Sequence, residues 1–356
     1  MQKKKKKKNN YFDSNLISFF NDIKSYIIFK KNEKLFNVGF FSENKFIFQY
    51  LSKYVYKKAK KKKIALISFE KIELSSNRNI ELFVFKTNFF RELLFLTLKL
   101  KLLYSSTPDL NNSLFKRSKF SKCKYIYLQH SPIGIIAGYN DDAFKSFDAV
   151  QAIHEYQYAE IKEISKKHNL KIKAFKGKYS FLENKNPLLI EESNVDVLIA
   201  PSWNTKFYEL KCHILLSNLF KEKKISFFIR PHPMSIKKRE VSLTELEDLN
   251  ITVNTNKEIN FNQFNFLVSD WSGIFIEYAF LKNRKSFLIN TPRKLLNSSF
   301  KKFASKSIEL EERENLANTY ETDQLKRLVS DIENLRNNKI PNKISNYSKF
   351  KSKFYL

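Results

Sequence analysis

The sequence predicts an α/β protein that contains two doubly wound units. The chain has 356 residues, 42% of them hydrophobic, which is enough for two domains that each bury a core. Short apolar runs of strand length alternate with charged, helix-like stretches, a pattern that predicts parallel strands joined by helical crossovers. The alternation stops at 177–193, where Gly177, Asn184, Asn186 and Pro187 break regular structure, and then resumes.

The elements follow in order along the chain. In the first unit we expect strands at 36–41, 64–69, 80–85 and 125–128, and helices at 14–30, 45–60 and 89–102. In the second we expect strands at 195–200, 225–229, 251–253, 264–268 and 286–289, and helices at 206–221, 273–281 and 309–337. The predicted organisation is a lysine-rich flexible tail (1–13), an N-terminal domain (14–178), a linker (179–194), a C-terminal domain (195–340) and a basic C-terminal tail (341–356).

The composition is strongly basic, with 65 Lys and Arg against 36 Asp and Glu, a net charge of +29. Only ten of these cations are Arg, so the excess fits either a solvated lysine-rich face or a site for polyanions, phosphates or an anionic membrane. With five Gly in the whole chain, each Gly is expected to serve a positive φ or the close approach of a ligand.

Other features limit the class of protein. The lysine run at 3–8 lacks the apolar region of a secretory signal, and charges interrupt the most apolar stretch, 89–104, so we expect no integral membrane segment. Cys123 and Cys212 have no metal or redox spacing and are expected in the core of a cytoplasmic protein. No zinc-type cluster or P-loop is present, and neither a metal nor another cofactor is expected.

Three segments at the carboxyl ends of predicted strands are candidates for chemistry, because ligands bind there in open α/β sheets. The first is His130, Ser131, Pro132 and Gly134, in which the imidazole suits proton transfer near neutral pH. A loop histidine that caps a turn is the alternative. His154, His168 and His213 lie on charged helical stretches and are expected at the surface.

The second segment is Arg230-Pro231-His232-Pro233, in which two prolines fix the backbone around His232 and Arg230 suits phosphate oxygens. The alternative is a structural proline turn.

The third segment is Ser269, Asp270, Ser272 and Gly273, followed by a helix that carries Glu277. A strand, then small polar residues, then a helix is the geometry in which backbone N–H groups and hydroxyls receive a phosphate. Glu277 would accept from ribose hydroxyls. The alternative is an N-cap on a buried helix.

In this order, the segments resemble the CDP-glycerol glycerophosphotransferase family, which builds teichoic-acid-type polyol phosphate polymers. The family's Ala-Pro-Thr-Trp segment is similar to Ala200-Pro201-Ser202-Trp203, its Arg-Pro-His-Pro is present at 230–233, and its His-Gly-Thr-Pro loop resembles the chain after His130. The chain departs from the family at Ser131, at Gly273 and at Asn283-Arg284.

The resemblance implies a GT-B type fold of two Rossmann-like domains facing a central cleft, with the acceptor on the N-terminal side and the nucleotide on the C-terminal side. His130 would act as general base, and His232 would act with it on the donor diphosphate. Arg230, Ser202, Trp203, Ser269, Asp270, Ser272, Gly273 and Glu277 would bind the nucleotide or its phosphates, and Ser131, Pro132 and Gly134 would lie on the acceptor side.

Three functions therefore stay open. The first is transfer of a polyol phosphate from a CDP-activated donor to a polymer or lipid-linked acceptor, with release of CMP, in the synthesis of a cell-surface polymer or capsule. The second is a GT-B glycosyltransferase that uses a CMP- or UDP-sugar. The third, a basic nucleic-acid-binding protein, lacks an Arg-rich face and base-stacking motifs. For the transferases, the lysines would also allow peripheral contact with the inner face of an anionic membrane.

Overall fold

The structure is a computed structural model that describes residues 2–110, 117–140, 142–182, 195–254, 259–297 and 299–355, with side chains from residue 15 onward. It divides into two compact units. Unit 1 comprises Met1–His130, Tyr139–Ile153 and Ile161–Phe181, and unit 2 comprises Ser131–Gly138, His154–Glu160 and Leu182–Leu356. Most of the expected linker, residues 183–194, lies outside the described residues.

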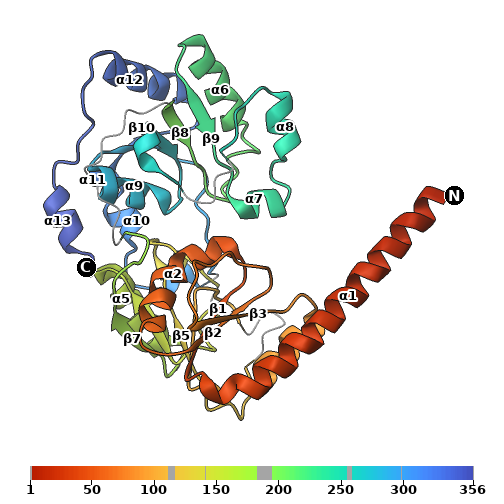
Figure 1. Cartoon of the computed structure of the whole chain (residues 1–356). Coiled ribbons are helices and arrows are strands. Elements are labelled where there is room, and N and C mark those ends of the chain that lie inside the picture. Colours follow the sequence, from red (N-terminus) through yellow and green to blue (C-terminus); the bar gives the residue numbers. More distant parts are fainter. Residues whose placement is uncertain are drawn as a thin grey trace. The chain divides into compact units, whose positions relative to one another are not determined.

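Unit 1 contains a parallel seven-stranded sheet in the order β3-β2-β1-β4-β5-β6-β7. Figure 1 labels β1, β2, β3, β5 and β7 of this sheet. The strands are β1 (Val38–Ser42), β2 (Ile64–Ser68), β3 (Ile80–Val84), β4 (Leu102–Ser105), β5 (Lys124–Tyr127), β6 (Ala149–Ala152) and β7 (Lys173–Lys176). The helices are α1 (Gln2–Asn32), α2 (Lys45–Ala59), α3 (Asn88–Thr97) and α5 (Glu155–Lys167), whose first residues belong to unit 2. Every residue of β1 and β2 is buried, which explains why both strands are continuous apolar runs.

Unit 2 contains a parallel five-stranded sheet in the order β12-β11-β10-β8-β9. The strands are β8 (Val195–Ile199), β9 (Phe227–Ile229), β10 (Phe264–Ser269), β11 (Ser286–Ile289) and β12 (Ala317–Tyr320). The helices are α4 (Ile135–Gly138), α6 (Cys212–Glu222), α7 (Pro233–Lys237), α8 (Leu243–Asp248), α9 (Ile274–Lys282), α10 (Ile308–Glu311), α11 (Arg313–Leu316), α12 (Leu325–Asn337) and α13 (Tyr347–Ser352).

Both sheets follow the doubly wound strand order, so the predicted α/β class is confirmed. In unit 2 the predicted strand at 251–253 is reduced to one bridge, between Ile229 and Val253, beyond the edge strand β9. Each sheet therefore starts at a central strand, β1 or β8, runs to one edge and then crosses to the other side.

Several predicted elements were wrong in their limits. The single helix expected at 309–337 is α10, α11, β12 and α12, because Ala317–Tyr320 pairs in parallel with β11. The helix expected at 206–221 starts only at Cys212, because Lys206 and Lys211 take positive φ angles. The helix expected at 14–30 extends through the lysine run and begins at Gln2.

Two of the histidines expected at the surface are buried. His154 is fully buried at the start of α5, and His213 lies on the inner face of α6 with its ring 5.1 Å from that of Tyr208. Other charged residues of these helices, such as Lys162 on α5 and Lys221 on α6, are exposed, but Glu160 on α5 is fully buried, so a charged stretch did not by itself indicate exposure. Cys123 and Cys212 are buried free thiols, as predicted.

Among the described residues, no helix combines the length and the apolar character needed to cross a bilayer.

Candidate functional site

Four loops meet at the carboxyl edge of the unit 2 sheet. They follow β8, β9, β10 and β11. Two of them contain the selected segments that begin at Arg230 and at Ser269, and the loop after β8 contains Ser202 and Trp203. β8 and β10 are neighbours although β9 lies between them in sequence, so the strand order reverses there. Such a switch point is where open α/β sheets bind ligands.

Asp270 joins the loops on either side of this switch point. Its buried carboxylate accepts hydrogen bonds from the backbone N–H of Ser202 (2.7 Å), from the Thr205 hydroxyl and from the backbone N–H of Trp271 (2.6 Å). Burial raises the pKa of Asp270, and these hydrogen bonds and Arg313 oppose the rise. Because its oxygens are engaged in this way, Asp270 orders the two loops rather than meeting a phosphate directly.

Ser269 has a similar structural role. It is fully buried, and its hydroxyl donates to the carbonyl oxygen of Ala200 at 2.7 Å. Ser272 is half-buried just before α9, whereas Glu277 is buried within the first turn of that helix. Of the three, Ser272 is the residue best placed to donate to a ligand.

Two lysines lie close to the indole ring of Trp203. The ammonium nitrogens of Lys238 and Lys294 are 4.3 Å and 4.5 Å from the ring centroid. Desolvation lowers the pKa of Lys294 to about 8, with Asp270 and Glu309 opposing the change. Lys294 therefore still carries its charge at neutral pH, in a place where water screens that charge poorly.

His232 lies on the same side as Trp203, with ring centroids 6.4 Å apart. It caps α7, and its Nδ1 accepts from the backbone N–H of Met234 at 3.1 Å. This bond fixes the tautomer that carries its proton on Nε2. Arg230, half-buried after β9, donates to the side-chain oxygen of Asn254 at 3.1 Å.

Two arginines pack on the second tryptophan, Trp271. The guanidinium carbons of Arg313 and Arg293 are 3.9 Å and 5.5 Å from its ring centroid. Arg313 is buried and donates to the backbone oxygen of Asp270 at 2.9 Å. Burial lowers the pKa of Arg313 to about 10, so it remains a cation at neutral pH.

Gly273 is needed for packing within unit 2. A Cβ there would lie 2.7 Å from Oγ of Ser131 and 2.9 Å from Cγ2 of Ile133. None of the five glycines has a positive φ, so the first of the two needs expected of them does not apply. The close approach that requires Gly273 is that of residues 131–133, which places this segment directly beside the start of α9.

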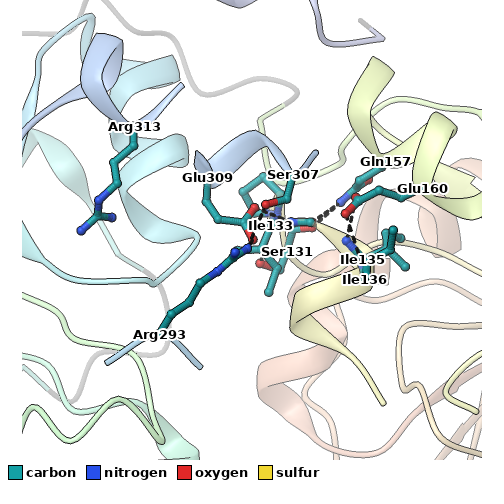
Figure 2. Close-up of polar contacts among 12 residues, drawn as sticks. Ser131, Ile133, Ile135, Ile136, Gln157, Glu160, Arg293, Ser307, Glu309 and Arg313 are labelled. Carbon is teal, nitrogen blue, oxygen red and sulfur yellow. Dashed lines mark hydrogen bonds and ion pairs between the residues drawn. The ribbon is translucent and has the colours of Figure 1, made fainter. Parts of the chain in front are cut away.

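The backbone of residues 131–136 is held by side chains from distant parts of unit 2 (Figure 2). Gln157 donates to the carbonyl oxygens of Ser131 (3.2 Å) and Ile133 (2.8 Å), and His154 donates from Nε2 to that of Pro132 at 2.8 Å. His154 accepts at Nδ1 from the backbone N–H of Gln157, so its neutral form makes both bonds.

Two buried glutamates bind the N–H groups of the same segment. Glu309 accepts from Gly134 at 2.8 Å, and Glu160 accepts from Ile135 (2.8 Å) and Ile136 (3.3 Å). Burial, and then the charge of Glu309, raise the pKa of Glu160 well above its ordinary value. Arg293 pairs with Glu309 at 3.0 Å, which partly balances this concentration of negative charge. A Cβ on Gly134 would lie 2.3 Å from Cβ of Ser307, so this position also requires glycine.

In unit 1, a chain of hydrogen bonds determines which nitrogen of His130 carries the proton. The amide of Gln129 donates from Nε2 to the carbonyl oxygen of Gln151 at 2.8 Å, which leaves its Oε1 to accept from the Tyr139 hydroxyl at 3.4 Å. Tyr127 then donates to Tyr139 at 3.2 Å.

Since the hydroxyl of Tyr127 has a single proton, its 2.7 Å contact with Nδ1 of His130 requires the imidazole to donate. The lone pair of the neutral ring is therefore on Nε2. His130 is half-buried, and the Tyr179 hydroxyl donates to its backbone oxygen at 3.2 Å. A neutral imidazole held in one tautomer is suited to act as a general base.

The sequence analysis missed several residues of unit 2, namely Lys238, Lys294, Arg293, Arg313, Glu160 and Glu309, and, in unit 1, the His130 partners Tyr127 and Tyr139. Arg293 and Arg313 are two of only ten arginines, the same signal that selected Arg230. The lysines gave no signal because lysine is abundant throughout the chain.

The fold is similar to that of solved proteins. A structure of the wall teichoic acid polymerase TagF, soaked with CDPG, has a TM-score of 0.56 at 12% identity over 95% of this chain and 92% of that chain. A UDP-N-acetylglucosamine 2-epimerase from Rickettsia bellii has a TM-score of 0.50 at 14% identity over 88% and 92% of the two chains. No protein-family model and no curated protein sequence match the chain. The likeness in fold confirms the GT-B type architecture.

Proposed function

We propose that the protein is a transferase that takes a group from a nucleotide diphosphate donor to an acceptor hydroxyl in the synthesis of a cell-envelope polymer. More specifically, the donor is a CDP-activated polyol, the transferred group is glycerol phosphate or a similar polyol phosphate, and CMP is released. The observation that carries the proposal is the set of cations at one edge of the unit 2 sheet, where Lys238 and Lys294 flank Trp203.

The phosphates of the donor would bind to these cations. Lys294 and Lys238 would neutralise charge beside Trp203, and Arg230 would do so from the neighbouring loop, where His232 would donate a hydrogen bond from Nε2. Ser272 and the backbone at Gly273 would donate hydrogen bonds. Such preorganised positive charge stabilises the charge that develops on the leaving phosphate.

Asp270, Ser269 and Ser202 support these contacts by ordering the loops after β8 and β10. The earlier assignments of Trp203 to the nucleotide and of Glu277 to its ribose stay part of the proposal.

His130 would remove the proton from the acceptor hydroxyl with the lone pair of Nε2. The acceptor oxygen forms a bond to the β-phosphorus of the donor, the bond from this phosphorus to the bridging oxygen breaks, and CMP leaves with the bonding electrons. The hydrogen-bond chain through Tyr127 and Tyr139 supports this role, because it keeps the Nδ1 proton in place.

Ser131, Pro132 and Gly134 would shape the acceptor side, and their fixed backbone supports this assignment. The acceptor would be a polymer or a lipid-linked chain. Peripheral contact of a cytoplasmic enzyme with an anionic membrane is part of the proposal.

A GT-B glycosyltransferase that uses a CMP- or UDP-sugar is the second candidate, because the same cations would hold its diphosphate or phosphate. Incubation with CDP-glycerol, CDP-ribitol, CMP-sugars and UDP-sugars, followed by assay of released CMP and UDP, separates the two. Release of CMP from a CDP-polyol supports the first function, and turnover of sugar nucleotides alone supports the second. If calorimetry detects no binding of any of these nucleotides, both are refuted.

A further inference from the structure

The outer side of α1 is an exposed apolar surface. Leu16, Ile17, Phe20, Ile27 and Ile28, which we call the α1 apolar face, are between 38% and 62% exposed. Residues 16, 20 and 27 share one side of a helix, and 17 and 28 lie on the adjoining strip. Unburied apolar side chains of this number on one helix side mark an interaction surface.

The opposite side of α1 is already occupied by unit 1. Asp22 is buried and accepts from the backbone N–H groups of Lys86 and Thr87 and from the Thr87 hydroxyl, so it holds the two residues that precede α3. Tyr26 contacts the Thr97 hydroxyl at 2.9 Å, at the other end of α3. These contacts fix the rotation of α1, and the α1 apolar face is therefore outward in the folded protein.

α3 extends the same surface. Phe89 and Leu96, seven residues apart on α3, are 59% and 51% exposed. The ring of Phe19 on α1 lies 6.3 Å from that of Phe89, which makes the two helices neighbours at this point. The apolar surface is thus formed by two packed helices.

Lysines accompany the apolar residues. Lys24 and Lys31 are exposed and fall on the same side of α1 as Phe20 and Ile27. The helix contains nine lysines and two aspartates, one of which is the buried Asp22. Apolar and aromatic side chains with lysines between them are typical of helices that lie in the interface of an anionic bilayer. A second copy of the chain fits less well, because two helices of this charge repel each other.

We propose that α1 and α3 form a membrane-binding surface for anionic phospholipid, in which the α1 apolar face with Phe89 and Leu96 enters the interface and the lysines bind the headgroups. The proposal concerns unit 1 alone and does not depend on the reaction that unit 2 supports.

The full chain is tested by sedimentation with vesicles of phosphatidylcholine alone and of phosphatidylcholine mixed with phosphatidylglycerol. We expect binding to the anionic vesicles only, weakened by high salt. The variant Phe20→Ser/Ile27→Ser should bind at least about tenfold more weakly, since each residue contributes through its buried apolar area. Lys24→Gln/Lys31→Gln should also weaken binding about tenfold or more, and reduce its salt dependence.

The matched control is Phe120→Ser, which removes a 94% exposed aromatic ring of unit 1 outside α1 and α3 and should leave binding unchanged. Tryptophan fluorescence gives a direct readout. Brominated phosphatidylglycerol should quench the fluorescence of a tryptophan introduced by Phe20→Trp but not that of one introduced by Phe120→Trp. The proposal is overturned if the protein binds both vesicle types equally, or if Phe20→Ser/Ile27→Ser binds as strongly as the wild type. It is also overturned if the wild-type protein binds no lipid but forms a dimer that is lost in this variant.

Discussion

The proposed base can be tested by removing one oxygen atom, through Tyr127→Phe. The substitution deletes the hydroxyl that accepts from Nδ1 of His130 at 2.7 Å and leaves the rest of a fully buried ring in place. A hydrogen bond of this kind contributes about 1 to 1.5 kcal/mol, so kcat should fall on the order of tenfold. The KM for the donor should stay near its original value, because the proposed phosphate contacts are in unit 2.

Two measurements check this expectation. Release of CMP from a CDP-polyol gives kcat and KM, and nitrogen NMR of labelled histidine shows which ring nitrogen of His130 is protonated, whatever the reaction. The wild-type protein should show protonation at Nδ1, and Tyr127→Phe a mixture of the two tautomers. Tyr179→Phe is the matched control, because it removes a tyrosine hydroxyl that contacts the backbone oxygen of His130. If Tyr127→Phe retains both the wild-type kcat and the Nδ1 tautomer, the inferred chain of hydrogen bonds is wrong.

Three other predictions concern unit 2. Lys294→Met should weaken the binding of a nucleotide diphosphate, measured by calorimetry, on the order of tenfold to a hundredfold, because a charge-assisted contact is lost. The control Lys237→Met, which changes an exposed lysine, should bind the nucleotide as the wild type does. Burial lowers the pKa of His154 to about 4, so the folded state favours the neutral ring. The free energy of unfolding should therefore be highest above pH 6.5 and fall by up to about 3 kcal/mol as the pH drops toward 4. The variant His154→Gln should lose this pH dependence, as measured by urea unfolding. Gly134→Ala should lower the free energy of unfolding by about 1 to 3 kcal/mol, because the added Cβ overpacks against Ser307. Adding Ser307→Gly should restore part of this stability in the same assay, and no recovery would show that the strain lies elsewhere.

The sequence allowed the fold class and the sheet edge to be predicted, because both depend on local patterns. Strands buried on both faces, such as β1, are continuous apolar runs that alternate visibly with helices. β12 was missed because its residues Ala317–Tyr320 lie among charged helical residues, and only pairing with β11 makes them a strand. Local propensity gives way to tertiary pairing in such segments.

The contacts that hold the candidate site were less predictable, because they join residues far apart in sequence. Glu309 binds the N–H of Gly134 across 175 positions, and neither residue alone indicates the other. In the second segment, by contrast, His232 and Met234 are two residues apart, and the proline on each side already indicated a fixed imidazole.

Glycine and arginine are rare in this lysine-rich chain, and each occurs at positions with a strict geometric requirement. The requirement was not always the expected one. Each of the five glycines would place a Cβ within 2.7 Å of another atom, and none has a positive φ. In the part of the chain that the structure describes, ten residues with side chains take a positive φ instead, among them Asn204 and Asn283. In this chain, glycine therefore occurs where there is no room for a Cβ atom, whereas positions with a positive φ are occupied by residues such as asparagine and lysine. The same reasoning applies to Arg293 and Arg313, whose planar groups pack over Trp271 while donating hydrogen bonds, a combination that the abundant lysine does not offer.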